Sequence, residues 1–212
     1  MKVLLVAATA PEIQPLLSAF AMQKELDKKT IGKHLVTVLI TGAGMVPTAF
    51  SLGRHLAQNS YDLAINAGIA GSFDFGIAPG EVCVVTEDTF AELGAEDGEE
   101  FLSFDSLGLG LSSHSGFPSP GFSTEGLREV IAITVNKIHG NELSIAKAMA
   151  RFNPQIESME GASFFYACEK SGLPCIQIRA VSNYVERRNR DKWDIPLAVA
   201  NLNDTIINLL ER

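Results

Sequence analysis

The sequence lacks the features that mark several common classes of protein. It has only three cysteines in 212 residues, Cys83, Cys168 and Cys175, and all lie in or beside apolar segments. Because the number is odd, buried and reduced thiols are expected rather than a disulfide framework, and a cytoplasmic location follows. No apolar run approaches the roughly 20 residues of a membrane-spanning helix, so no membrane association is expected.

Positive charge is also scarce. Lysine and arginine number 17 against 25 aspartates and glutamates, which gives a formal net charge of −8. A nucleic-acid partner would require clustered basic residues, and the one basic cluster, residues 187–192, is interrupted by Asn189 and Asp191. Nucleic acid is therefore not an expected partner.

Motifs for metals and cofactors are missing as well. The four histidines lie far apart in the sequence, at His34, His55, His114 and His139. No His-x-x-x-His or Cys-x-x-Cys spacing occurs, so no metal site is expected. Pro47 stands where a dinucleotide-binding turn would have its third glycine, and no Gly-Lys-Ser/Thr phosphate loop occurs. We expect no cofactor.

The sequence does contain a regular alternation of apolar strands and amphipathic helices. The expected strands cover residues 2–8, 35–40, 63–67, 82–86, 131–135 and 175–181. The expected helices begin at Pro11 and cover about 45–59, 141–151, 160–170 and 193–210. With 46% apolar residues and no linker or fixed repeat, this pattern predicts one α/β domain over residues 1–212. Its expected architecture is a three-layer α/β/α arrangement around a mixed, mostly parallel sheet.

Residues 94–126 interrupt this alternation. They are acidic at first, then rich in serine, glycine, phenylalanine and leucine, with Pro118 and Pro120. Such a long irregular segment is usually a lid, an interface or a mobile loop, and the sequence does not choose among these. Its four phenylalanines indicate that it packs on something, at Phe101, Phe104, Phe117 and Phe122. We expect a homo-oligomer, most simply a dimer, in which this segment contacts the neighbour.

Polar residues gather where expected strands end. Glu12 follows the first strand at a helix start opened by Pro11, although a carboxylate in a first turn is also favoured by the helix dipole alone. Glu160 opens another helix, and Asn183 follows the strand at 175–181. Ligands of parallel sheets bind outside the carboxyl ends of the strands, so the acid and the amide can face one crevice. The pattern favours a site for a small polar ligand.

Two short stretches carry a resemblance to a known family. Ser-Met-Glu-Gly-Ala at 158–162 and Arg-Ala-Val-Ser-Asn at 179–183 resemble the nucleoside phosphorylase and nucleosidase superfamily. The chain looks closest to its methylthioadenosine/adenosylhomocysteine nucleosidase branch, while residues 84–97 and 183–196 resemble one other hydrolase of the superfamily. The resemblance covers nearly the whole chain. It implies the superfamily fold and an enzyme that hydrolyses the N-glycosidic bond of a purine nucleoside.

The resemblance also implies roles for named residues. Glu12 would activate the attacking water. Met159 and Glu160 would cradle the ribose, with the carboxylate accepting hydrogen bonds from the sugar hydroxyls. Ser182 and Asn183 would hold the purine base.

Further binding candidates are less specific. The glycine-rich segment 68–72 is expected as a loop that lies under the ribose, which makes Gly68 and Ala70 candidates. Gly42 and Gly44 either ease a tight turn or contact the ligand through the backbone. Phe90 could stack on the base or belong to the core. A substrate carboxylate could meet an arginine, with Arg187 chosen over its neighbours at 188 and 190.

Two other functions stay open. A phosphorylase would require positive charge beside the glycine-rich segment, and Arg54, well down a helix, is the only arginine expected near it. A non-catalytic nucleoside-binding protein would have no need of Glu12 as a base. Asn183 replaces the aspartate of the adenosine-cleaving nucleosidases. Its amide can donate to O6 and accept from a protonated N7, which favours a 6-oxopurine, although asparagine after a strand is also a common turn residue.

Overall fold

The computed structural model describes residues 1–22, 26–117 and 119–212, so Pro118 lies outside the described residues. The main sheet contains β1 (Lys2–Ala7), β2 (Lys28–Ile31), β3 (His34–Ile40), β4 (Leu63–Ser72), β5 (Val82–Phe90), β8 (Ser113–Ser115), β9 (Arg128–Thr134), β10 (Ile156–Ser158) and β11 (Cys175–Tyr184). The helices are α1 (Ala10–Ala19), α2 (Met45–Leu56), α3 (Glu142–Phe152), α4 (Gly161–Ser171) and α5 (Ile195–Glu211), with a short 3₁₀ turn η1 (Arg190–Lys192) before α5. Every expected strand and helix is present.

The sheet is mixed, and part of it closes on itself. β1 lies between β3 and β4 and is parallel to both. β11 is parallel to β4 and antiparallel to β5, while β9 is parallel to both β5 and β10. β10 then pairs antiparallel with β4, so β4, β11, β5, β9 and β10 form a ring. At one rim of this ring Gly71 of β4 faces Glu157 of β10 on one side and Asn183 of β11 on the other.

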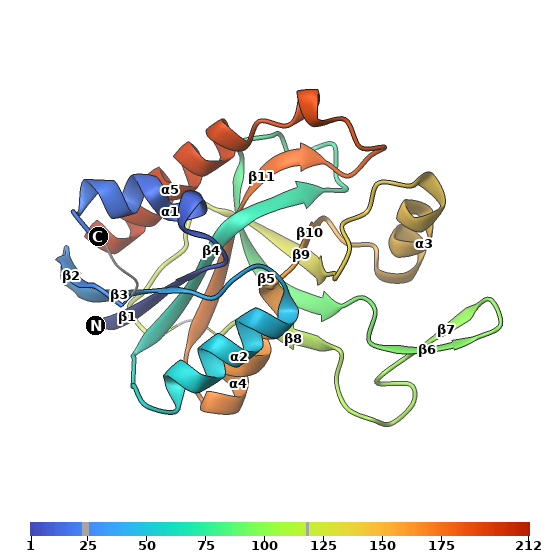
Figure 1. Cartoon of the computed structure of the whole chain (residues 1–212), viewed down its shortest axis with the longest axis horizontal. Helices are drawn as coiled ribbons and strands as arrows, with labels where there is room; N and C mark the ends of the chain where they lie inside the picture. The colour runs from blue at the N-terminus through green and yellow to red at the C-terminus, as the bar shows by residue number, and fades with distance from the viewer. Residues whose placement is uncertain (23–25, 118) are drawn as a thin grey trace.

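Helices cover both faces of the sheet, which confirms the three-layer arrangement. Figure 1 shows α1 and α5 on one face, α2 and α4 on the other, and α3 with the β6–β7 hairpin at one end. Successive residues of a strand point to opposite faces. Leu5 accordingly packs in the core under α1 and α5, and its neighbour Leu4 packs with Leu52 of α2 and Phe164 of α4. Burial on both faces explains why the central strands are almost wholly apolar.

Two strands run further than the sequence predicts. Residues 68–72 were expected as a loop, but they continue β4 because β11 pairs with them as far as Ser72 and β10 pairs with Gly71 and Ser72. β11 likewise continues past Val181 through a bulge to Tyr184. Glycine has low strand propensity, and pairing with neighbouring strands overrides that preference here. Asn183 is therefore part of a bulged strand rather than a turn.

Residues 94–126 are more regular than expected. β6 (Gly94–Asp97) and β7 (Glu100–Ser103) form a separate hairpin, and β8 adds to the edge of β5. Phe122 is buried in the core with α1 and α5, and the Phe101 ring lies 3.9 Å from the guanidinium carbon of Arg151. These two phenylalanines therefore pack on their own chain.

The cysteines agree with the sequence analysis. Cys83, Cys168 and Cys175 are all buried free thiols. Among the described residues, no helix is both long enough and apolar enough to cross a bilayer.

Candidate active site

A cavity of about 350 Å³ opens where β4, β10 and β11 meet the start of α1. We call it the first cavity. Its wall contains six of the residues singled out from the sequence, namely Glu12, Ala70, Met159, Glu160, Ser182 and Asn183. These residues come from four separate segments of the chain, so the fold brings together groups that are up to 171 positions apart, from Glu12 to Asn183.

A second cavity of about 450 Å³ adjoins the first. The two share five wall residues, Gly71, Ile138, Glu157, Asn183 and Trp193. The second cavity extends from this shared wall toward Lys137, His139 and Arg188. Asn183 and Glu157 thus stand at the boundary, and the two cavities together offer room for a ligand with two distinct parts.

The Glu12 carboxylate is held in one orientation. Thr9 is the N-cap of α1, and Glu12 occupies the third helical position. Glu12 Oε2 accepts from Thr9 N at 2.9 Å and Thr9 Oγ1 at 2.8 Å, while Oε1 accepts from Ile69 N at 3.2 Å. This is the capping box of the helix, so the purely structural role left open by the sequence is present. The same carboxylate also lines the first cavity, and the three donors fix its direction.

Gly68 lies beneath Glu12 rather than on the cavity wall. A Cβ atom at this position would lie 3.0 Å from Glu12 Oε1 and would overlap the Arg179 guanidinium. Glycine is therefore required here because two charged side chains approach its Cα atom.

Arg179 is the charged residue near the glycine-rich segment that sequence reasoning missed. The expectation that Arg54 is the only arginine in that region was wrong, because Arg179 of β11 pairs in register with Gly68 of β4. Its side chain is 1% exposed, and Nη2 donates to Asn66 Oδ1 and to Gln177 Oε1. An arginine inside a mostly apolar strand was the available signal, since buried arginines are rare unless paired.

Glu160 is the N-cap residue of α4 and is almost fully buried. Its Oε1 accepts from Gly44 N at 2.9 Å, and its Oε2 lies 3.7 Å from Arg179 Nη1. Gly44 has φ +98°, a conformation that favours glycine. Gly44 therefore positions Glu160 through its backbone N–H group.

The Asn183 amide is held on both of its polar ends. Its Oδ1 lies 2.8 Å from Ser182 Oγ, and its Nδ2 donates to the Tyr184 carbonyl oxygen at 2.9 Å. An amide has two N–H groups and an oxygen with two lone pairs. One N–H group and one lone pair therefore remain for a ligand in the adjoining cavities.

The buried Glu157 pairs with the partly buried His139 at the boundary between the cavities. Glu157 Oε1 accepts from His139 N at 2.9 Å, and Oε2 lies 2.5 Å from His139 Nδ1. Burial raises the pKa of Glu157, and the hydrogen bonds from His139 oppose that rise. Sequence reasoning selected neither residue, because they lie 18 positions apart and outside any motif.

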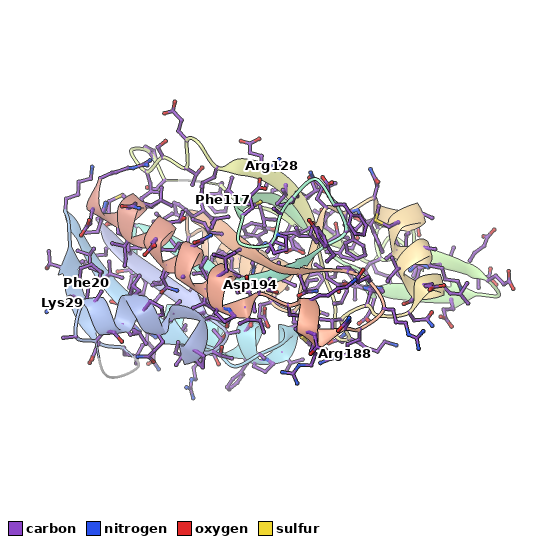
Figure 2. All side chains as sticks on the ribbon, turned by 90° about the horizontal axis from the view of Figure 1, so that it is seen from above. Phe20, Lys29, Phe117, Arg128, Arg188 and Asp194 are labelled. Atoms are coloured by element: carbon purple, nitrogen blue, oxygen red, sulfur yellow. The ribbon has the colours of Figure 1, made fainter. Side chains whose placement is uncertain are left out.

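Phe90 and Arg187 are not brought to either cavity. Phe90 lies on a separate cavity of about 250 Å³ beside Met45, and its ring makes an edge contact with His114 at 5.7 Å. The second cavity is lined by Arg188 rather than Arg187, with the Arg188 guanidinium carbon 5.1 Å from the Trp193 ring. Figure 2 labels Arg188 on the connection from β11 into α5.

The chemistry available is that of two fixed carboxylates and an amide. Glu12, Met159 and Glu160 line the first cavity, and Asn183 lies on the wall that it shares with the second cavity. Carboxylates of this kind can take a proton from water or accept from hydroxyl groups. Within the described ranges, no three His, Cys, Asp or Glu side chains gather as the ligands of a metal ion would.

Comparisons of sequence identify related proteins. The profile of the Phosphorylase superfamily matches residues 2–211. Futalosine hydrolase of Thermus thermophilus is 31% identical over 81% of this chain and 80% of its own length. Futalosine hydrolase of Streptomyces coelicolor is 30% identical over 97% of this chain and 94% of its own length.

Comparisons of structure agree on the fold. Futalosine hydrolase of Helicobacter pylori superposes with a TM-score of 0.80 at 15% identity, covering 100% of this chain and 98% of that one. The 5'-methylthioadenosine/S-adenosylhomocysteine nucleosidase of Neisseria meningitidis, in complex with methylthio-immucillin-A, gives a TM-score of 0.80 at 16% identity, covering 99% and 98%.

Proposed function

Because the chain belongs to the phosphorylase superfamily and, within it, to the futalosine hydrolases, we propose that it hydrolyses futalosine to hypoxanthine and dehypoxanthinyl futalosine. The enzyme is an N-glycosyl hydrolase of purine nucleosides. Futalosine hydrolase of the menaquinone pathway is also the protein that residues 84–97 and 183–196 resemble. The observation that carries the proposal is the first cavity, in which Glu12 and Glu160 are both fixed by backbone N–H donors.

Each group fits one task of the reaction. Breaking the bond between sugar and base develops positive charge on the sugar and negative charge on the purine. Glu12 would orient and deprotonate the attacking water, and Glu160 would accept from the ribose hydroxyls while Met159 packs against the sugar. Asn183 would hydrogen-bond the base as its negative charge grows. Arg179 would hold Glu160 in place, since its Nη1 lies 3.7 Å from Glu160 Oε2.

Water is favoured over phosphate as the nucleophile. Arg179 supplies positive charge beside Gly68, but it is buried and its Nη groups already face Asn66, Gln177 and Glu160. It is not among the residues that line the first cavity. A phosphate would need donors that are free to reach it.

The test of the function is the release of hypoxanthine from futalosine, measured with and without phosphate. We expect the same rate in both conditions. A rate that requires phosphate or arsenate would assign the protein to the phosphorylases instead. If no purine nucleoside releases its base, the hydrolase proposal fails and a nucleoside-binding function remains.

We further propose that the enzyme is a homodimer. The outer face of α2 exposes Val46 and Phe50, the latter 66% exposed, and the segment from 94 to 126 exposes Leu109 and Leu111. Exposed apolar side chains of this size are typical of surfaces that a partner covers.

Light scattering at micromolar protein is expected to give twice the chain mass of 22.8 kDa. Phe50→Glu is expected to shift the mass toward that of the single chain, because it places a charge on the apolar face. Leu143→Glu is the matched control, since Leu143 is 75% exposed on α3, outside the proposed interface. A mass of 22.8 kDa for the unaltered protein would contradict the dimer.

A further inference from the structure

A chain of buried polar side chains runs from Arg179 across three neighbouring strands, away from the cavities. Gln177 Oε1 accepts from Arg179 Nη2 at 3.3 Å, and Gln177 Nε2 donates to Asp88 Oδ2 at 2.9 Å. Asp88 Oδ1 accepts from Thr134 Oγ1 at 2.7 Å. Asp88 is 0% exposed and has no part in the roles proposed above.

Asp88 determines the orientation of the Gln177 side-chain amide. An ionised carboxylate only accepts, so Asp88 selects the NH₂ end of the Gln177 amide. The oxygen end of that amide must then point at Arg179, where it accepts from Nη2. If the amide turned over, an NH₂ group would face a guanidinium N–H group in a buried site, which is unfavourable.

The same network supports the first turn of α4. Thr134 Oγ1 accepts from Ala162 N at 2.8 Å while it donates to Asp88. A side chain at Gly161 would overlap Asp88 Oδ2 and Gln177 Oε1, so the backbone of this turn lies directly on the network. Glu160 is the N-cap of this helix. Asp88 is therefore linked to Arg179 on one side and to the backbone next to Glu160 on the other.

Burial disfavours the ionised form of the Asp88 carboxylate. Burial raises the pKa of Asp88 to about 6, although the hydrogen bonds from Gln177 and Thr134 and the charge of Arg179 lower it. This pKa lies above that of an aspartate in the unfolded chain. The contribution of Asp88 to the free energy of unfolding is therefore fully present at low pH and is lost as pH rises through about 6. At neutral pH the protein thus holds an ionised Asp88 at the expense of stability.

We propose that Asp88 is a positioning residue for the hydrolytic reaction, which acts through Gln177 to hold the Arg179 guanidinium beside Gly68 and Glu160. This inference rests on the proposed function of the same site. Misplacing a catalytic group by about 1 Å can cost ~10²-fold in rate. Asp88 is three contacts away from Glu160, through Gln177 and Arg179. Asp88→Asn replaces an acceptor oxygen by a donor, so the Gln177 amide is no longer held in one orientation. We expect kcat to fall about 10-fold.

The pH profile of kcat separates positioning from a merely structural role. The charged groups that face Asp88 are Arg179 from β11 and Glu160 from α4, while Gln177 and Thr134 are neutral. In the unaltered enzyme, kcat is expected to fall as pH drops through about 6, because protonated Asp88 can donate and turn the Gln177 amide. Asp88→Asn is expected to lose this dependence and to keep the lower rate throughout.

The experiment compares hypoxanthine release by the unaltered enzyme, Asp88→Asn, Gln177→Leu and the double variant. Gln177→Leu removes the link between Asp88 and Arg179, so the double variant is expected to be no slower than the slower single variant. Circular dichroism establishes that each variant is folded at the assay temperature. If the fold-decreases in rate of the two single variants multiply in the double variant, the two residues act independently and the proposal is overturned.

A kcat that stays constant from pH 7 to about 5 in the unaltered enzyme would also overturn it, even if no variant folds. Absence of hydrolysis by the unaltered enzyme would instead contradict the proposed function. An active enzyme whose rate and pH profile do not respond to Asp88→Asn would contradict only the role of Asp88.

Discussion

Glu12→Gln is expected to lower kcat for hypoxanthine release by at least ~10²-fold, because a neutral amide cannot take a proton from water. The side chain keeps its size, so the cavity keeps its shape. In the native protein the Glu12 carboxylate accepts hydrogen bonds from Thr9 and Ile69 at 2.8 to 3.2 Å. The NH₂ group of glutamine cannot accept, so it would face one of these donors without forming a hydrogen bond. A loss of stability of about 0.5–2 kcal/mol is expected from the weakened cap.

A second helix cap provides the control for that loss. Asp194 caps α5 by accepting from Leu197 N at 3.0 Å, and Figure 2 labels it at the start of that helix. Asp194→Ala is expected to lower stability by about 1 kcal/mol while kcat stays within about 2-fold of the unaltered value. Thermal unfolding and steady-state kinetics are measured on the unaltered protein, Glu12→Gln and Asp194→Ala. A fall of less than about 10-fold for Glu12→Gln would show that this carboxylate only caps α1.

Asn183→Asp is expected to lower hypoxanthine release by at least ~10²-fold and to raise the relative activity on the 6-amino analogue. The amide can donate to O6, whereas an ionised carboxylate would face O6 lone pair against lone pair. The structure adds a second reason. Asn183 Nδ2 donates to the Tyr184 carbonyl oxygen at 2.9 Å, and an aspartate oxygen there would be repelled unless it carried a proton.

The measurement is the ratio of kcat/KM for 6-oxo and 6-amino nucleosides in both proteins. Ser182→Ala is the matched control, because it removes the hydroxyl 2.8 Å from Asn183 Oδ1 and leaves the amide itself in place. We expect Ser182→Ala to affect both nucleosides alike and Asn183→Asp to change the ratio. An unchanged ratio in Asn183→Asp would mean that Asn183 does not read the base.

Local patterns were enough to place the secondary structure and part of the site. The helix α4 ends before Gly172, whose φ of +62° is the left-handed conformation expected of a glycine stop. Glu12, Glu160 and Asn183 were found because each lies at the end of a strand or the start of a helix. Such positions can be located from a short window of sequence.

Contacts between distant strands were beyond the reach of local patterns. Residues 68–72 look like a loop until β10 and β11 pair with them. Arg179 looks like an isolated charge in an apolar strand until register places it opposite Gly68. Phe90 was chosen as an aromatic residue at the tip of an expected strand, and Arg187 as a member of the basic cluster. The structure places Phe90 on a separate cavity, and the second cavity is lined by Arg188 instead of Arg187.

The sequence by itself determined the fold class, the family and the three polar groups at strand and helix ends, because periodicity and short motifs are properties of neighbouring residues. Only the tertiary structure decided which charges meet. The pairings of Glu157 with His139 and of Arg179 with Gln177, which in turn bonds Asp88, depend on strand order and register. A shift of one residue in register would turn the side chains that lie on strands, those of Glu157, Arg179, Gln177 and Asp88, to the opposite face of the sheet.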